Sequence, residues 1–473
     1  MGAGLGTGTG LGTEKGARRR GMDDLLTIAQ AVVDQASAGE EIEVYVARGH
    51  ETQVRVFDGE VESFSSSDSS GVGIRVLIDG GGEGKRVGFA WAGSLDQSVI
   101  ATALDNARDN AIYATSDPYI SLARPDGVEA TSLELCDPSF ETFSIDAKVA
   151  LAIDLERQVR DSDIRIRQVS SADYGDDQVE VALASTMGIA GYSHRTSAFL
   201  SVSAIAGKGT DSQTGTGFSV GRGPACLDPD HAARDAVLRS TRMLGASRTN
   251  SKRCVAVFDS RAVSTLLGVI SSAFSGEAVV KGRSFFADRI GECVATSGVT
   301  LVDDPTDPRA FSAASRDGEG LACRRNVLVD DGVLQGFLYD TVSGNRAGTA
   351  STGSALRGGF ATTPTAGCRA LVLQPGTLSQ DEILGLVGEG IYIQSMTGVH
   401  SGVNVVSGDF SVGVEGLMVR DGVLAEPVRE ITVASTLQRM LQEIVYIGSD
   451  LEWLPGVAAG QTLAIADMQI SGD

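Results

Sequence analysis

The segment 275–286 carries an acidic and a basic residue four positions apart, Glu277 and Lys281, and ends a helix predicted to begin near Ser260. On an α-helix, positions i and i+4 lie on one face, so these two side chains can meet. A glutamate can serve as a general base, and in zinc peptidase helices it stands between two histidine ligands. No histidine flanks Glu277. Three interpretations stay open: an active site, a site without its former metal, or a plain helix end.

Histidines and cysteines are spaced too widely for a local metal motif. The four histidines are His50, His194, His231 and His400. The six cysteines include no Cys-x-x-Cys pair, and no cysteine stands in a local sequence typical of a nucleophile. The residues themselves therefore predict neither a metal ion nor a catalytic cysteine in this chain. Only a cluster formed in the folded protein would change that expectation.

Two charged turns are further candidates for chemistry. Asp303 and Asp304 precede Pro305, and paired carboxylates can hold a metal or share a proton. In a turn, such residues more often accept hydrogen bonds from backbone amides, and this is the favoured interpretation. The segment 316–320 alternates charged residues with glycine, which predicts a turn that can line a cleft.

The run Thr397–Ser411 holds the highest density of hydrogen-bonding side chains in the chain. Its glycines allow another backbone to approach closely, so an extended peptide can be held beside a strand edge there. The alternative is a glycine-rich hairpin within a sheet, and both stay open. Glu277 and Lys281 are candidate residues for substrate or partner binding, and the run adds five more: His400, Asn404, Ser407, Asp409 and Ser411.

Hydrophobic patterning predicts an α+β protein with a tail and three units. Residues 1–21 are rich in glycine and threonine and predict a disordered tail. Residues 22–115 and 116–246 each predict a helix-plus-hairpin unit, because a helical stripe is followed by alternating apolar residues. Residues 247–473 predict a β-rich domain with a large, mostly antiparallel sheet. Asp-Gly pairs at Asp58, Asp331 and Asp421 predict tight hairpin turns.

Charge and hydropathy exclude some classes of partner. The chain has 39 basic and 61 acidic residues, a net charge of −22. Such a chain repels phosphate, so direct nucleic-acid binding is not expected. No apolar run approaches the length of a membrane span, and no apolar run follows the basic residues Arg18–Arg20 as in a signal peptide. The expected compartment is the cytoplasm.

Four segments together resemble the TldD/PmbA family, known as modulators of DNA gyrase and as peptidases. They are Ser275–Phe286, Val302–Pro305, Ser351–Gly353 and, most clearly, Gly398–Ser411. The resemblance covers about residues 22–470. It implies an N-terminal α/β unit, a central unit and a C-terminal β-rich unit. It also implies a cytosolic heterodimeric peptidase, built from two paralogous subunits, that degrades or processes unfolded peptides.

The chain departs from the zinc-bearing paralogue of that family at three points. The zinc helix of the form His-Glu-x-x-x-His would place histidines at Gly276 and near Val280 or Lys281. The expected late cysteine ligand is also missing, since no cysteine follows Cys368. Glycine and valine cannot bind zinc, and an ammonium group repels it. The chain therefore resembles the metal-free PmbA/TldE-like subunit, with no cofactor of its own and zinc expected in a TldD-like partner.

Two other functions remain as alternatives at this stage. The first is a non-enzymatic binding or regulatory protein that acts on gyrase or on a toxin–antitoxin system. The second is a metal-independent hydrolase in which Glu277 is the base, although no nucleophile or electrophile is evident beside it.

Overall fold

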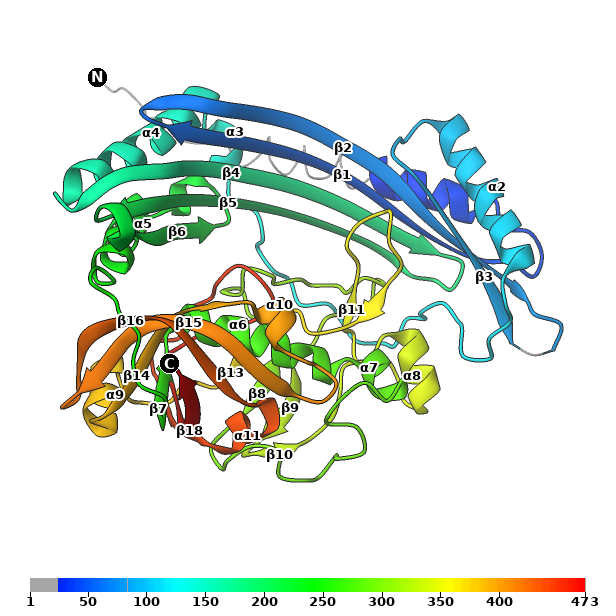
Figure 1. Cartoon of the computed structure of the whole chain (residues 1–473). Coiled ribbons are helices and arrows are strands. Elements are labelled where there is room, and N and C mark those ends of the chain that lie inside the picture. The colour runs from blue at the N-terminus through cyan, green and yellow to red at the C-terminus, as the bar shows by residue number, and fades with distance from the viewer. Residues whose placement is uncertain (1–23, 83, 473) are drawn as a thin grey trace, which may run out of the picture.

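A long antiparallel sheet from the N-terminal half arches over a β-rich C-terminal half (Figure 1). The computed structural model describes residues 24–82 and 84–472. The predicted tail, residues 1–21, lies outside the described residues. Within the described ranges, no helix has both the length and the apolar character needed to cross a membrane. The α+β class predicted from the sequence is confirmed.

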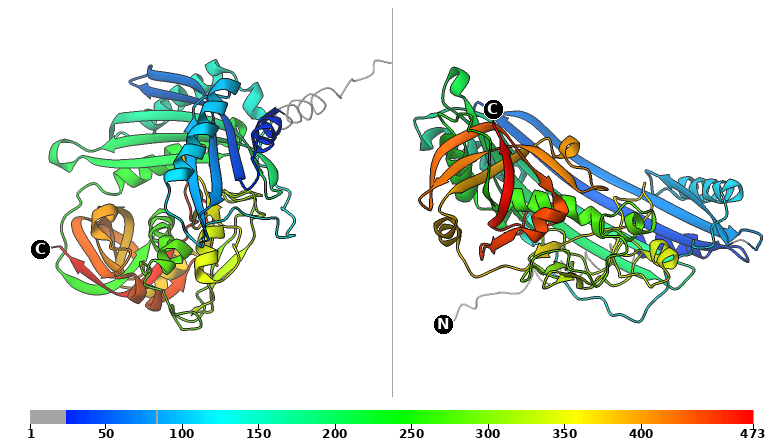
Figure 2. Two further views of the ribbon diagram at one scale, coloured as in Figure 1. Left: turned by 90° about the vertical axis from the view of Figure 1, so that its right-hand side faces the viewer. Right: turned by 60° about the horizontal axis from the view of Figure 1, so that its bottom comes forward.

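The N-terminal sheet has six strands in the order β3-β2-β1-β4-β5-β6. The strands are β1 Glu41–Phe57, β2 Glu60–Asp79, β3 Lys85–Ala92, β4 Ile166–Ser185, β5 Ala190–Ala206 and β6 Gln213–Gly221. The central pair, β1 and β4, runs antiparallel from Glu43 opposite Ser185 to Val56 opposite Ala172. The two units predicted at 22–115 and 116–246 thus contribute three strands each to one continuous sheet. Figure 2 shows this sheet extending across the C-terminal half.

Successive side chains of β1 point to opposite faces of the sheet, so the two sets of side chains pack against different neighbours. Ile42 and Val44 are fully buried in a cluster with the helix at residues 24–33 and with α2 (Gln97–Tyr113). Further along the strand, Val54 packs in a second cluster with α4 (Ile145–Ser162) and α5 (Pro229–Thr241). Glu43 and Tyr45 alternate with Ile42 and Val44 and point to the opposite face, where both contact Arg357 of the C-terminal half.

The three predicted Asp-Gly turns are confirmed. In each, both residues have positive φ, as a two-residue type I′ turn requires. The angles are 53° and 79° at Asp58–Gly59, 46° and 82° at Asp331–Gly332, and 50° and 79° at Asp421–Gly422. Aspartate tolerates this left-handed conformation and glycine adopts it at no steric cost. The two residues alone were therefore enough to predict each turn.

The main C-terminal sheet runs β16-β15-β14-β7-β18-β17, and an additional β16–β18 pairing closes five of its strands into a ring. Its strands are β7 Lys252–Phe258, β14 Gly390–Thr397, β15 Asp409–Arg420, β16 Val423–Thr436, β17 Ile444–Ile447 and β18 Leu463–Ser471. Only the β7–β14 pairing is parallel among the described strand pairs of this sheet. The predicted large, mostly antiparallel sheet is therefore confirmed.

Smaller elements complete the C-terminal half. A four-stranded sheet runs β10-β9-β8-β13, and β11 pairs with β12. These strands are β8 Leu301–Asp303, β9 Asn326–Asp330, β10 Val333–Leu334, β11 Ala355–Leu356, β12 Thr365–Ala366 and β13 Leu371–Leu373. The helices of this half are α6 Ser260–Ser271, α7 Gly276–Val280, α8 Thr341–Ala347, α9 Gln380–Val387, α10 Val399–Gly402 and α11 Leu437–Gln442, while the short α3 Ser139–Thr142 belongs to the N-terminal half. The largest buried cluster of the chain packs α6 against these sheets.

One prediction about this half is wrong: the helix that begins near Ser260 does not continue through Lys281. Instead α6 ends, a 3₁₀ turn follows, and Ser275 is extended at φ −67° and ψ 123° before α7 starts. The backbone breaks because it bonds to Leu338. The Gly276 amide donates to the Leu338 carbonyl at 2.7 Å, and the Leu338 amide donates to the Phe274 carbonyl at 2.9 Å. These long-range bonds outweigh helical continuity.

Candidate functional site

Glu277 and Lys281 form the predicted ion pair on α7. The Lys281 ammonium donates to the Glu277 carboxylate, and the two side chains are 42% and 41% exposed, respectively. An exposed i, i+4 pair of this kind contributes only about 0.3–0.5 kcal/mol. The pair is thus a surface contact, with each charge already partnered by the other.

Two cavities flank this pair. One, of about 460 Å³, lies toward Ser275, Ala366 and Cys368. The other, of about 340 Å³, is shared with Arg75 of β2 and Asp340 of the turn before α8. Because Glu277 and Lys281 line both cavities, α7 stands where the N-terminal sheet meets the C-terminal half.

The donor set on α7 does not fit a zinc ion. A Cβ atom at Gly276 would lie 2.2 Å from the Tyr339 ring and 2.7 Å from the Leu338 carbonyl oxygen. The position therefore lacks a ligand and lacks room for one without rearrangement. Lys281 presents an ammonium group beside Glu277. Throughout residues 24–82 and 84–472, no three His, Cys, Asp or Glu side chains gather as a metal-binding group.

The polar run Thr397–Ser411 is a connection within the sheet. Thr397 pairs with Gly413 across β14 and β15, and β15 pairs on its other side with β16. Of the two alternatives, the glycine-rich hairpin is therefore the one observed, because the described part of this run offers no open strand edge. The five candidate residues are all exposed: His400, Asn404, Ser407, Asp409 and Ser411.

Those five residues divide by their contacts. The Asn404 side chain accepts from the amides of Val406 and Ser407 at 2.9 and 3.2 Å, and the Ser407 hydroxyl donates to Asp409 at 2.7 Å. These three hold the loop in shape. The side chains of His400 and Ser411 have no such partner among the described residues. None of the five lines either cavity beside Glu277, so the structure does not join the two predicted site regions into one pocket.

The acidic turn at 303–305 behaves as the favoured interpretation predicted. Asp303 is fully buried, and its carboxylate accepts from the amides of Arg369 and Ala370 at 2.8 and 2.7 Å. Burial raises the pKa of Asp303 to about 6. Asp304 accepts from the amide and hydroxyl of Thr306 at 3.1 and 2.6 Å. Both aspartates therefore accept hydrogen bonds from backbone amides, Asp304 within the turn and Asp303 from the segment at Arg369 and Ala370.

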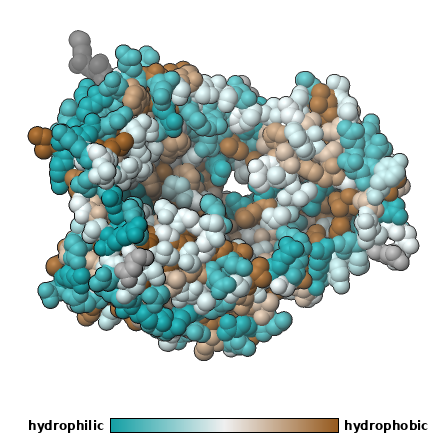
Figure 3. All heavy atoms as spheres, in the orientation of Figure 1, coloured by the Kyte–Doolittle hydropathy of each residue, from teal (hydrophilic) through white to brown (hydrophobic). Residues whose placement is uncertain are grey.

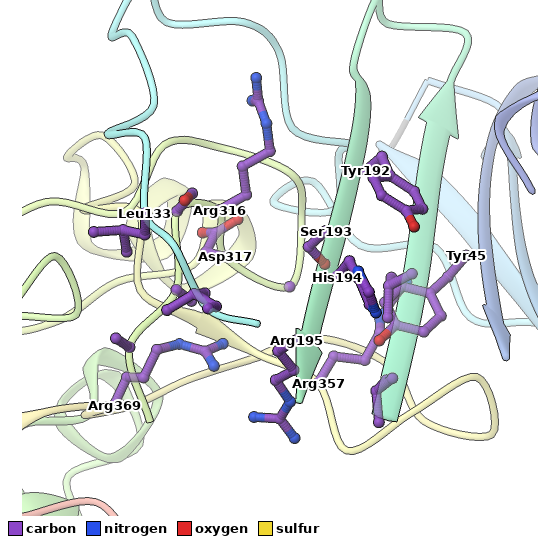
Figure 4. A pocket seen from close by; sticks show the side chains of 17 residues that line it. Tyr45, Leu133, Tyr192, Ser193, His194, Arg195, Arg316, Asp317, Arg357 and Arg369 are labelled. Atoms are coloured by element: carbon purple, nitrogen blue, oxygen red, sulfur yellow. The ribbon is translucent and has the colours of Figure 1, made fainter. Parts of the chain in front are cut away.

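A pocket rich in arginine, missed by the sequence analysis, lies between the N-terminal sheet and the C-terminal half (Figure 4). It has a volume of about 270 Å³ and is called the arginine pocket for its residues Arg195, Arg316, Arg357 and Arg369. Only the turn at 316–320 was predicted to line a cleft, and it does. The other arginines come from β5 and from loops far apart in sequence, so no local motif announces them.

A buried ionic network lies behind this pocket. Glu43 accepts two bonds from Arg75, at 2.9 and 2.6 Å, and one from Arg357 at 2.6 Å. Burial acts to raise the pKa of Glu43, but the charges of both arginines bring it below its ordinary value. Glu319 is fully buried, with one oxygen 3.9 Å from Arg75, and burial raises its pKa to about 8. Because Arg75 also lines the smaller α7 cavity, Glu43 connects the walls of the two sites.

Comparison with known proteins places this architecture in a family. Residues 42–111, 138–244 and 251–472 match the sequence models of domain 1, the central domain and the C-terminal domain of the PmbA/TldA metallopeptidases. Metalloprotease PmbA from Escherichia coli O157:H7 is 26% identical over 459 residues, which cover 96% of this chain and 97% of that protein.

Two further comparisons agree. The metalloprotease TldD homolog of Buchnera aphidicola subsp. Acyrthosiphon pisum is 25% identical over 408 residues, covering 82% of this chain and 81% of that protein. The crystal structure of TldE from Thermococcus kodakarensis has the same fold, with a TM-score of 0.85 at 22% identity, and the match covers 96% of this chain and 100% of that one. With all three domain models matched in order over well over half of its length, the chain belongs to the PmbA/TldD metallopeptidase family.

Proposed function

We propose that this chain is the subunit without a catalytic metal in a heterodimeric, TldD/TldE-like peptidase that degrades or processes unfolded peptides. Zinc is supplied by a TldD-like paralogue. Membership in a metallopeptidase family supports the peptidase role. In this role the chain shapes and encloses the site at which the partner cuts the peptide.

The observation that carries the proposal is the structure of α7. The resemblance implies histidine ligands at two positions of this helix. The first holds Gly276, which is packed against Tyr339, and the second falls at or next to Lys281, which is ion-paired with Glu277. A glutamate remains between them, but its carboxylate is bound to the lysine. This arrangement supports a helix retained for its packing, with the metal chemistry in another subunit.

The exposed loop Thr397–Ser411 is the proposed contact for the partner or for peptide. His400 and Ser411 present side chains that bond to none of the described residues, on a loop in which Asn404 accepts hydrogen bonds from two backbone amides. Preorganised polar groups of this kind cost little entropy to engage. We also place the protein in the cytoplasm, and its six cysteines, all free thiols, support a reducing compartment.

The test is reconstitution with a TldD-like paralogue from the same genome. Each chain is purified alone and the two are then mixed, with cleavage of an unfolded model peptide as the readout. Cleavage that requires both chains supports the proposal. Cleavage by the paralogue that is indifferent to this chain contradicts it and favours the alternative, a binding or regulatory protein that acts on gyrase or on a toxin–antitoxin system.

A further inference from the structure

The arginine pocket has the composition of an anion site in a strongly acidic protein. Its sheet wall includes Tyr45 of β1, Val179 of β4 and the segment 192–195 of β5. Its opposite wall comes from the C-terminal segment 313–318 together with Arg357 and Arg369. Four arginines and a histidine line the cavity, against a single carboxylate, although the chain as a whole carries a net charge of −22.

That single carboxylate forms no hydrogen bond or ion pair with the four arginines among the described residues, although the charge of Arg369 acts to lower its pKa. Asp317 is buried, and one of its oxygens accepts from the amides of Glu319 and Leu321, each at 2.9 Å. Its other oxygen accepts from the amide of Ala355 at 3.1 Å. Burial raises the pKa of Asp317 to about 6. Both oxygens of Asp317 thus accept hydrogen bonds from backbone amides, two in its own turn and one at Ala355.

Two of the four arginines donate hydrogen bonds from their side chains within the protein, and the other two do not do so with any described residue. Arg357 bonds to Glu43 at 2.6 Å and lies 4.7 Å from the ring centre of Tyr45, while Arg316 donates to the Gly320 carbonyl at 2.9 Å. The guanidinium groups of Arg195 and Arg369 make no hydrogen bond or ion pair with any described residue. Figure 4 shows the Arg369 side chain extending from the C-terminal wall toward β5, which carries Arg195.

The apolar side chains that line the pocket indicate which class of anion it can hold. Leu133, Leu135 and Val181 give the pocket an apolar side next to its arginines. Guanidinium groups bind planar carboxylates through paired N–H donors, and apolar walls favour a ligand with a hydrocarbon body over a bare inorganic ion. At about 270 Å³, the cavity is slightly below the lower end of small-molecule sites, about 300 Å³, so it suits a group of about one residue in size.

We propose that the arginine pocket binds a carboxylate-bearing ligand with a short apolar body, held by Arg195 and Arg369. Two sources share this chemistry: the C-terminal residue of a peptide and a free small carboxylic acid. The inference rests on the pocket alone and holds whether or not the chain takes part in a peptidase.

Calorimetric titration of the full chain tests this with four probes: N-acetyl-Leu-Ala as the free acid, its C-terminal amide, 3-methylbutanoate, and inorganic phosphate. The expected result is binding of at least one of the two carboxylates, with the amide and phosphate weaker by about tenfold or more. Tighter binding of N-acetyl-Leu-Ala identifies the ligand as a peptide C-terminus, and tighter binding of 3-methylbutanoate identifies it as a free carboxylic acid. Measurable binding of the acetyl dipeptide acid and its amide with equal affinity, tighter binding of phosphate than of either carboxylate, or no binding of either carboxylate at millimolar concentration overturns the proposal.

Variants locate the site. Arg369→Gln and Arg195→Gln are each expected to weaken carboxylate binding by about tenfold or more, and Arg369→Lys to restore part of it because a positive charge returns. Arg167→Gln, which removes an exposed arginine of β4 outside the pocket, is the matched control and leaves affinity unchanged. Thermal unfolding of each variant separates loss of binding from loss of fold. A folded Arg369→Gln/Arg195→Gln double variant with unchanged affinity contradicts the assignment.

Discussion

Glu43 of the N-terminal sheet and Arg357 of the C-terminal half are joined by a hydrogen-bonded ion pair of 2.6 Å, although 314 positions separate them in sequence. Both side chains are almost completely buried, at 2% and 3% exposure. Because Glu43 also receives two bonds from Arg75, one carboxylate pairs with cations from both halves of the chain. This contact joins the two halves beside the arginine pocket, of which Arg357 is a lining residue.

Replacing Glu43 with glutamine is expected to destabilise the fold by about 3–5 kcal/mol, because it removes the carboxylate that is hydrogen-bonded to two buried guanidinium groups. Urea unfolding at neutral pH measures this. Glu60→Gln, at an exposed position of β2, is the control and stays within about 0.5 kcal/mol of the unchanged chain. A similar small effect of Glu43→Gln would mean that the pair contributes little.

Burial raises the pKa of Glu319 to about 8, compared with 4.5 for the unperturbed group. The folded state therefore holds a proton that the unfolded state releases. Stability is full below pH 4.5 and falls as pH rises toward 8. Asp303 and Asp317, with pKa values of about 6, act in the same direction at lower pH. The interval from pH 6 to 8 thus isolates Glu319 among these carboxyl groups.

Glu319→Gln is expected to flatten the pH dependence of unfolding in that interval. The unchanged chain loses stability relative to the variant with a slope approaching about 1.4 kcal/mol per pH unit. Urea unfolding of both proteins at pH 6, 7 and 8, at constant ionic strength, gives the difference directly. Parallel curves for the two proteins would show that Glu319 does not carry this proton.

Gly276 and Gly268 give a matched pair for the packing of α7 and α6. Gly276→Ala is expected to cost about 1–3 kcal/mol, because its Cβ would lie 2.2 Å from the Tyr339 ring. Gly268→Ala, inside α6 with only Val457 nearby at 3.8 Å, is expected to stabilise by about 0.5–1 kcal/mol. Thermal unfolding distinguishes them by opposite shifts in midpoint. A stabilising Gly276→Ala would remove the steric argument against a side chain at this position.

In the exposed loop Thr397–Ser411, we expect His400 and Ser411 to contact the partner without contributing to the fold of the loop. His400→Ala combined with Ser411→Ala leaves the loop folded, since neither side chain has a partner within the described structure, and weakens association with the TldD-like paralogue by about tenfold. Asp381→Ala, at an exposed position on α9, is the control. Association is measured by calorimetry or surface plasmon resonance. Unchanged affinity of the loop variant places the partner contact elsewhere.

What was predictable from sequence was local. The Asp-Gly turns follow from the φ angles that these residues tolerate, and the ion pair of Glu277 and Lys281 follows from helical spacing. The break at Ser275 was not predictable, because it depends on hydrogen bonds to Leu338, some sixty residues away. Sequence patterns record propensity, and here a distant contact overrides it.

The arginine pocket illustrates the same limit on a larger scale. Arg195 lies on β5, while Arg369 lies in a loop of the C-terminal half, and nothing in the spacing of either predicts that they share a cavity. Charge counting indicated an acidic protein that repels phosphate and is not expected to bind nucleic acid. That average does not reveal a local reversal of charge, which arises only when the sheet and the C-terminal half are packed together.

Glu277 also tests the hydrolase alternative. Because its carboxylate is bound to Lys281, Glu277→Gln is expected to leave peptide turnover by the mixed complex unchanged, and stability within about 0.5 kcal/mol. A loss of turnover of a hundredfold or more, with the complex intact, would instead assign Glu277 a role as base.

The most direct test of the central proposal is metal analysis of the purified chain, alone and in complex with the TldD-like paralogue, on samples also assayed for peptide cleavage. The account predicts no stoichiometric zinc and no cleavage for the chain alone. It predicts one zinc per heterodimer, with cleavage that requires both subunits. One zinc per chain together with peptidase activity in the isolated protein would contradict it.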